Sequence, residues 1–254
     1  EGTDTLMLTD RIGYRWYEFR TDHPPFDDAR VRKALAISIN REVLLKNVLQ
    51  TPETPLLGFI PEAYPDLLDP SKSWREVHGN SFEENIEEAK ALLAEAGFPN
   101  GEGFPKFRLV AETSASLEKV AQAMAQMWKQ NLGIEAEIQM VESSVYWADK
   151  TGTRNAGEFE VCYMGYTGDY LDPSSMLFNF TSYDNDSTMW ANEEFDALMA
   201  RASAGAAGEE REQIFVEAEK LLSEEFPVFP VYNYISMALV SDKVGGFVRN
   251  YVGH

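Results

Sequence analysis

The spacing of hydrophobic residues along the chain switches repeatedly between the period of a strand and the period of a helix. Five stretches carry apolar residues at alternate positions or in short runs, as β-strands do. These predicted strands cover residues 11–20, 107–111, 134–140, 159–164 and 228–240. Between them, apolar residues recur three and four positions apart, which places them on one face of a helix. This alternation predicts an α/β fold in which helices cover a sheet.

Residues that favour helix ends mark where the predicted helices begin and stop. Asp27 and Asp28 open the first helix. Ser81, with Glu84 three residues later, matches a capping box, and Gly97 ends the helix that follows. The other predicted helices cover residues 43–49, 116–131, 143–154, 192–204 and 209–224.

The segment between residues 51 and 79 contains five prolines, so no helix can run through it. It also carries many large apolar side chains, whereas a linker between domains would be more polar. These are Leu56, Leu57, Phe59, Ile60, Tyr64, Leu67, Leu68 and Trp74. We therefore interpret the segment as a long ordered loop packed on the core, and not as a domain boundary.

Composition and charge restrict the class of protein. The chain has 254 residues, 44% of them hydrophobic and 12% aromatic, which fits a globular protein with a sizeable core. Its formal net charge is −20, so it repels phosphate backbones, and nucleic acid is not an expected partner. No window approaches eighteen consecutive apolar residues, so we expect no membrane span. Residues 1–4 lack an initiator Met and a basic, then apolar, leader, so we expect no signal peptide within these residues.

Catalytic and metal-binding chemistry has little support in the sequence. Cys162 lies within a predicted strand, which indicates a small buried apolar group. The three histidines lie at no ligand spacing to one another or to Cys162, and residues 184–186 lack the Gly and Glu of a calcium loop. We expect no metal, no cofactor and no enzymatic activity. The alternative is a hydrolase that uses the carboxylates of Asp169 and Asp172.

The stretch 165–173, Gly-Tyr-Thr-Gly-Asp-Tyr-Leu-Asp-Pro, holds the strongest candidate site. It follows a predicted strand and precedes a predicted helix start at Asp172. A strand that ends in glycines, aromatic residues and an acid would present backbone amides and a carboxylate at a sheet edge. Such an edge suits a ligand that carries a cation and a peptide-like backbone.

Five blocks in order resemble the C-terminal half of the family 5 extracellular solute-binding proteins, the peptide receptors of ABC importers. The blocks are residues 24–42, 88–98, 127–134, 159–173 and 229–232, the last followed by 245–247. The resemblance implies a lobe like those of type II periplasmic binding proteins, with a mixed β-sheet flanked by helices. Residues 1–227 would form this ligand-binding lobe, and residues 228–254 would form the strand and tail that cross to an N-terminal lobe.

The resemblance also implies roles for individual residues. Asp169 stands where an acid pairs with the α-amino group of a peptide, and Gly165 and Thr167 stand where backbone groups pair with an extended peptide. Tyr166 matches an aromatic contact, and Arg154 an arginine that meets a ligand carboxylate. Tyr232 and Asn233, at the closing block, complete the candidate set.

Two departures from that pattern leave the ligand class open. Tyr163 and Leu117 stand where oligopeptide receptors carry an arginine and a histidine. Receptors for oligosaccharides or metal chelates share the same framework and stay as alternatives. The resemblance implies a monomeric periplasmic or extracytoplasmic protein that captures oligopeptides by closing a cleft and delivers them to membrane permease subunits.

Overall fold

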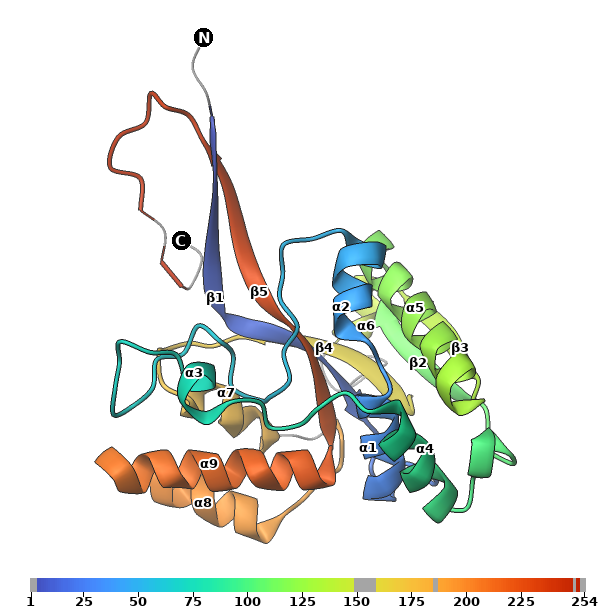
Figure 1. The fold of residues 1–254 in the computed structure, drawn as a ribbon. Coiled ribbons are helices and arrows are strands. Elements are labelled where there is room, and N and C mark those ends of the chain that lie inside the picture. Colours follow the sequence, from blue (N-terminus) through green and yellow to red (C-terminus); the bar gives the residue numbers. More distant parts are fainter. Residues whose placement is uncertain (1–3, 149–158, 185–186, 249, 252–254) are drawn as a thin grey trace.

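Within the residues that the structure describes, the strands form one mixed sheet, as the pattern of strands and helices predicts. The computed structural model describes residues 4–148, 159–184, 187–248 and 250–251. The five strands lie in the order β3-β2-β4-β1-β5 (Figure 1). Their bounds are Thr5–Phe19 for β1, Phe107–Glu112 for β2, Ala136–Val141 for β3, Val161–Thr167 for β4 and Val228–Val240 for β5. Strand β2 runs parallel to β3 and β4, whereas β1 runs antiparallel to β4 and β5.

Helices cover the sheet on both sides. In Figure 1, α1, α2, α4 and α5 lie on one side of β1 and β5, and α3, α7, α8 and α9 lie on the other. The first set comprises α1 (Ala29–Ile37), α2 (Arg41–Val43) with the π-helix η1 (Leu44–Leu49), α4 (Ile86–Glu95), the 3-10 turn η2 (Pro99–Gly101) and α5 (Ala115–Leu132). The second comprises α3 (Trp74–His78), α7 (Ser174–Leu177), the 3-10 turn η3 (Phe178–Phe180), α8 (Glu193–Ser203) and α9 (Gly208–Glu225). The short α6 (Ser143–Tyr146) follows β3.

The alternation of side chains along β1 builds a core on each face of the sheet. Tyr17 stacks on Phe229 of β5 with ring centroids 5.5 Å apart. Trp16, one position earlier, points to the other face and meets Phe180 edge-on at 5.7 Å. All four rings are at most 1% exposed, so β1 is the strand around which both cores pack.

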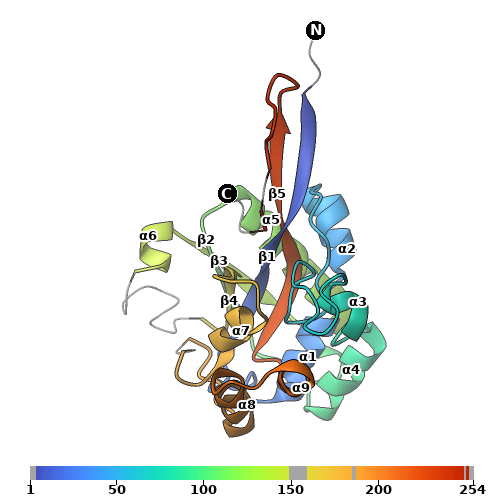
Figure 2. The same ribbon diagram turned by 90° about the vertical axis from the view of Figure 1, so that its left-hand side faces the viewer.

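Strands β1 and β5 continue beyond the rest of the sheet as a two-stranded ribbon (Figures 1 and 2). Its pairs run from Thr5 opposite Val240 to Asp10 opposite Ile235. The ribbon leaves large apolar side chains exposed, namely Leu6, Leu8, Met237 and Leu239. The first half of β5 is different, because residues 228–233 are all buried in the sheet of this chain. The predicted boundary at 227/228 falls directly before these six buried residues.

The Pro-rich segment packs on the core as predicted, although it contains α3. Its side chains Leu56, Phe59, Ile60, Tyr64 and Trp74 are at most 1% exposed. The buried carboxylate of Glu219, from α9, accepts the backbone N–H groups of Phe59 and Ile60 at 2.7 and 3.0 Å. It also accepts the Trp74 indole N–H at 3.0 Å and pairs with Arg75. A single carboxylate thus satisfies the polar groups where a loop without regular structure is buried.

The predicted capping box at Ser81 and Glu84 is wrong. Helix α4 begins at Ile86, and the side chain of Asn85 caps it by accepting the backbone N–H of Glu88. Glu84 instead accepts the backbone N–H of Arg41 at 2.9 Å and one of its guanidinium N–H groups at 3.1 Å. The buried guanidinium of Arg41 competes for this carboxylate, which spacing in the sequence does not reveal.

Two further expectations concern Cys162 and membrane spans. Cys162 is fully buried in β4, as predicted for a small apolar group. No helix among the described residues has both the length and the apolar character needed to cross a bilayer. The predicted helix over 143–154 begins with α6, and residues 149–158 lie outside the described residues.

Candidate ligand-binding site

Strand β4 has an open side along its second half. The prediction that it lies at a sheet edge is wrong, because β4 is the third of the five strands. Strand β2, however, pairs with β4 only at Val161 and Cys162, whereas β1 accompanies β4 to Thr167. Residues 163–167 therefore have no strand on one side within the described part of the chain. The two neighbours of β4 separate because β2 leaves β4 after Val110 and continues to Glu112 paired only with β3, while β1 stays paired with β4 to Thr167.

The peptide groups of alternate residues face this open side. The Gly168 N–H donates to the Ile12 carbonyl of β1 at 2.6 Å, and the Tyr146 hydroxyl donates to the Tyr163 carbonyl from the opposite side. Peptide groups two residues apart on a strand point in the same direction. The N–H and C=O groups of Gly165 and Thr167 consequently point away from β1, into the unpaired edge.

A hollow of about 310 Å³ lies where β4 ends. It is lined by acids, aromatic rings and small polar side chains from β4, α7, η3 and the loops that follow β4 and η3. The lining residues are Tyr166, Asp169, Tyr170, Ser175, Phe178, Asn179, Tyr183 and Asp184. Two carboxylates surrounded by tyrosine rings attract a cation both by charge and by the π-faces. The hollow therefore suits an ammonium group.

Asp169 is held at the rim of the hollow in an exposed position. Its Oδ2 accepts the Tyr166 hydroxyl at 2.5 Å, and its backbone N–H donates to Ser175 Oγ at 2.8 Å. Among the described residues no cation pairs with this carboxylate. Burial and the hydrogen bond to Asp169 raise the pKa of Tyr166 to about 12, so Tyr166 stays a neutral donor that orients the acid.

The neighbouring Asp172 has a structural task. Its carboxylate pairs with Arg211 of α9 at 2.9 Å and accepts the Ser174 backbone N–H at 2.9 Å. Burial opposes ionisation, but the hydrogen bonds from Arg211 and Ser174 outweigh it and lower the pKa of Asp172. The carboxylate is therefore fixed as an anion in an ion pair, which argues against the alternative of a hydrolase that uses Asp169 and Asp172.

The fold brings together four of the seven predicted site residues. Gly165, Tyr166, Thr167 and Asp169 occupy the open edge of β4 and its end, whereas Arg154 lies outside the described residues. Tyr232 and Asn233 are 7% and 4% exposed on β5 and do not line the hollow. The Asn233 amide donates to Thr54 Oγ1 at 3.1 Å and accepts the Glu62 N–H at 3.1 Å. These bonds fasten the 51–79 segment to β5.

The sequence analysis missed a pair of arginines on β1 next to this edge. Arg15 lies opposite Gly165 in the register of β1 and β4, and Arg11 donates to Thr167 Oγ1 at 3.0 Å. Alternation along β1 gives these positions no functional signal, because the strand register that places them beside β4 is a tertiary property.

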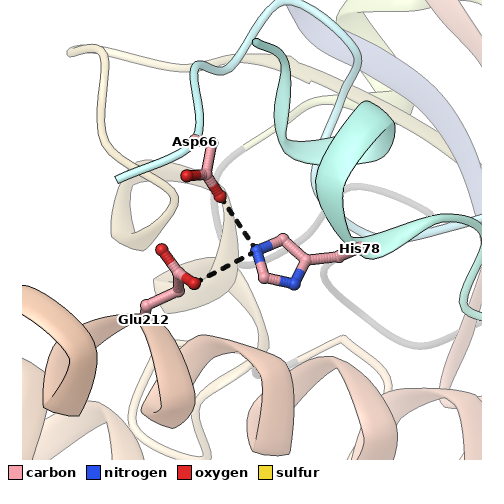
Figure 3. A group of neighbouring side chains, drawn as sticks. All are labelled: Asp66, His78 and Glu212. Carbon is pink, nitrogen blue, oxygen red and sulfur yellow. Dashed lines mark hydrogen bonds and ion pairs between the residues drawn. The ribbon is translucent and has the colours of Figure 1, made fainter. Parts of the chain in front are cut away.

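One group of metal-ligating side chains gathers among the described residues, between α3 and α9 (Figure 3). His78 Nε2 lies 3.0 Å from Asp66 Oδ2 and 3.6 Å from Glu212 Oε1, and the three ligand atoms lie within 4.8 Å of one another. Such spacing can hold a divalent ion or, with a protonated imidazole, an ion-pair cluster. None of these residues lines the hollow at Asp169.

Comparisons with known proteins show which proteins this chain resembles. Residues 4–188 match the profile of the bacterial extracellular solute-binding proteins, family 5 Middle. The dipeptide-binding protein DppE of Bacillus subtilis is 32% identical over 256 residues, which cover 99% of this chain and 46% of that protein. The periplasmic murein peptide-binding protein MppA of Escherichia coli is 33% identical over 242 residues, covering 94% and 43%.

Solved structures give the same result. The periplasmic oligopeptide-binding protein OppAIV of Borrelia burgdorferi superimposes with a TM-score of 0.82 at 28% identity, over 92% of this chain and 45% of that one. The chain thus spans less than half the length of these relatives. They are binding proteins, in agreement with the prediction of a non-enzymatic protein. From its match over residues 4–188 and its identity to these relatives, the chain belongs to the bacterial extracellular solute-binding proteins of family 5.

Proposed function

We propose that the chain is the ligand-capturing lobe of an extracytoplasmic substrate-binding protein that delivers oligopeptides to an ABC importer. The observation that carries this proposal is the half-open strand β4, whose unpaired edge leads directly to an acidic and aromatic hollow. Two relatives named as dipeptide-binding and murein peptide-binding support the same ligand class.

A peptide binds by adding a strand to β4. Its backbone pairs with the N–H and C=O groups of Gly165 and Thr167, which have no strand partner in the described part of the chain. Its α-amino group enters the hollow and pairs with Asp169, next to Tyr166. The ammonium replaces water at a carboxylate that lacks a cationic partner among the described residues, so the pairing adds affinity where no internal ion pair must be broken.

Capture uses a second lobe joined through the ribbon of β1 and β5. The exposed leucines at positions 6, 8 and 239 give this ribbon an apolar surface that suits burial against another part of the protein. We assign residues 5–10 and 235–240 to the crossing, with residues 228–233 remaining in this lobe. The two lobes hinge around the peptide, and the closed monomer engages permease subunits on the outer side of the membrane.

The test measures peptide affinity by calorimetry on the full-length receptor with Asp169→Asn. We expect binding of tripeptides with a free amine to weaken by about 2–5 kcal/mol, because a charged partner is lost. N-acetylated tripeptides lack the ammonium group, so their affinity for the wild type should be as low as their affinity for the variant. Asp27→Asn, at an exposed acid before α1, is the matched control and should leave affinity unchanged. Unchanged affinity in Asp169→Asn would remove this carboxylate from the site.

The 254-residue chain alone should bind the same peptides poorly, since one lobe supplies only part of the contact surface. Micromolar or tighter binding by this chain would contradict capture between two lobes.

A further inference from the structure

The cluster of Asp66, His78 and Glu212 draws its three side chains from separate elements, and they point toward one another (Figure 3). Asp66 belongs to the loop before α3, His78 is the last residue of α3, and Glu212 lies on α9. His78 Nε2 is 3.0 Å from the Asp66 carboxylate and 3.6 Å from that of Glu212. Tetrahedral coordination with bonds of about 2.0–2.2 Å separates neighbouring ligand atoms by about 3.3–3.6 Å. The spacing around His78 is therefore close to what one zinc ion requires.

Two of the three side chains are held in place by groups outside the cluster. The imidazole of His78 lies against the indole of Trp74, with ring centroids 4.1 Å apart. Asp66 Oδ1 accepts the backbone N–H groups of Leu68 and Asp69 at 3.0 and 2.7 Å, while Oδ2 faces His78. Metal ligands are commonly oriented by such outer contacts, which leave one atom of each ligand directed at the ion.

Glu212 lacks the partners that a shielded carboxylate needs. Its Oε2 is shielded from solvent and accepts no hydrogen bond within the described part of the chain. Such an oxygen is costly, and proteins seldom leave one without a partner. Glu219, two turns further along α9, shows the usual arrangement, because both of its oxygens accept N–H groups from the 51–79 segment. A cation within the cluster would supply what Glu212 lacks.

Charge favours a divalent ion over a proton on His78. The side chains of His78, Glu212 and Asp66 are only 18%, 13% and 2% exposed, and no Lys or Arg of the described residues pairs with either acid. A protonated imidazole beside two carboxylates leaves one negative charge in this shielded site, whereas a divalent ion with a neutral imidazole leaves none. One nitrogen and two carboxylate ligands suit zinc, while magnesium and calcium prefer oxygen alone.

We propose that Asp66, His78 and Glu212 bind a zinc ion that fastens residues 66–78 to α9. Three protein ligands leave a fourth position for water, which the partial exposure of His78 and Glu212 allows. The ion would hold the irregular 51–79 segment at a second point, in addition to its bonds with Glu219. Zinc binding would thus stabilise the lobe, since the ligands come together only in the folded chain.

The test measures zinc affinity on the full-length receptor after removal of metals with a chelator. A competing chromogenic chelator reports binding at about pH 7.5, where the imidazole is neutral. We expect micromolar or tighter binding by the wild type, unaffected by equal concentrations of magnesium or calcium. Glu212→Gln and His78→Gln should each weaken zinc binding by at least about 100-fold, since loss of an outer contact alone costs about 10–100-fold. Glu217→Gln, at an exposed acid of α9, is the matched control and should keep the affinity.

Limited proteolysis locates the ion. Zinc should slow cleavage within residues 51–79 by at least about tenfold in the wild type and in Glu217→Gln, but not in Glu212→Gln. Absence of zinc binding by the wild type overturns the inference whether or not the variants fold, and the cluster is then an ion-pair group with a protonated imidazole. Equal zinc affinity of the wild type and both ligand variants places the ion elsewhere and overturns it too. Peptide capture at β4 is measured separately and does not depend on either result.

Discussion

Two arginines, the buried Arg41 in the body of the lobe and the half-buried Arg15 beside β4, have opposite surroundings. In the body, Arg41 is fully buried and bonds to three carbonyls and to Glu84. Beside β4, Arg15 is clamped by two tyrosine rings but donates to no described residue. The same contrast divides two acids of one loop. Asp172 pairs with Arg211, whereas Asp169 accepts a hydrogen bond from a neutral tyrosine and has no described cation.

This difference separates stability from function. A buried charge whose partners all lie within the chain contributes to holding the fold and has little left to offer a ligand. A charge that is oriented but unpaired costs folding free energy, and a ligand of opposite charge recovers that cost on binding.

The largest expected effect on the unfolding free energy is that of Arg41→Met, which removes the fully buried arginine in the body of the lobe. Three buried carbonyls would lose their donor, and the unfolding free energy measured in urea should fall by about 3–5 kcal/mol. Arg30→Met, at an exposed arginine, should change it by less than about 0.5 kcal/mol. A loss below about 1 kcal/mol in Arg41→Met would show that the body tolerates unpaired groups too.

A smaller loss is expected for Glu219→Gln. The amide cannot serve all the donors that now meet the carboxylate, and the Arg75 guanidinium would lose its anion. We expect about 2–3 kcal/mol of destabilisation and faster proteolytic cleavage within residues 51–79. Cleavage at the wild-type rate would mean that apolar packing alone holds this segment.

The Asp172–Arg211 pair predicts a pH dependence. The pKa of Asp172 is lower in the folded chain, so its stabilisation is complete above the unfolded pKa near 4 and is lost as pH falls through the folded value. Asp172→Asn should cost about 1 kcal/mol at pH 7 and progressively less as the pH falls below about 4. Parallel stability profiles for wild type and variant down to about pH 2 would contradict this ion pair.

The smallest effect on stability is expected at the β4 edge. Arg15→Met replaces an unpaired cation with an apolar side chain of similar length, which offsets the lost contacts with the rings. The unfolding free energy should change by less than about 1 kcal/mol in either direction. A loss of unfolding free energy above about 2 kcal/mol would show that Arg15, like Arg41, stabilises the fold, and the two arginines would then not differ.

Local sequence patterns predicted the helices and strands well where the spacing of apolar residues is regular. The spacing of apolar residues located all five strands, including β5 over 228–240, and Asn192 caps α8 as predicted. The prediction failed at Ser81 and Glu84. Their residue types and spacing match a capping box, but Glu84 binds Arg41. A buried guanidinium 43 positions away outweighs a local N–H as a partner for that carboxylate, because a charged hydrogen bond in the core is stronger.

The sequence by itself determined the α/β class and the family, and it singled out residues 165–169 as the candidate site. The spacing of apolar residues, the turn residues and the order of motifs are local properties of the chain. Only the tertiary structure decided that β4 is an inner strand with one open half, and that Arg15 lies across from Gly165. It also brought Glu212 to His78, which the spacing of histidines did not predict. Strand order, register and the pairing of distant charges depend on the simultaneous packing of segments far apart in sequence, so no local pattern records them.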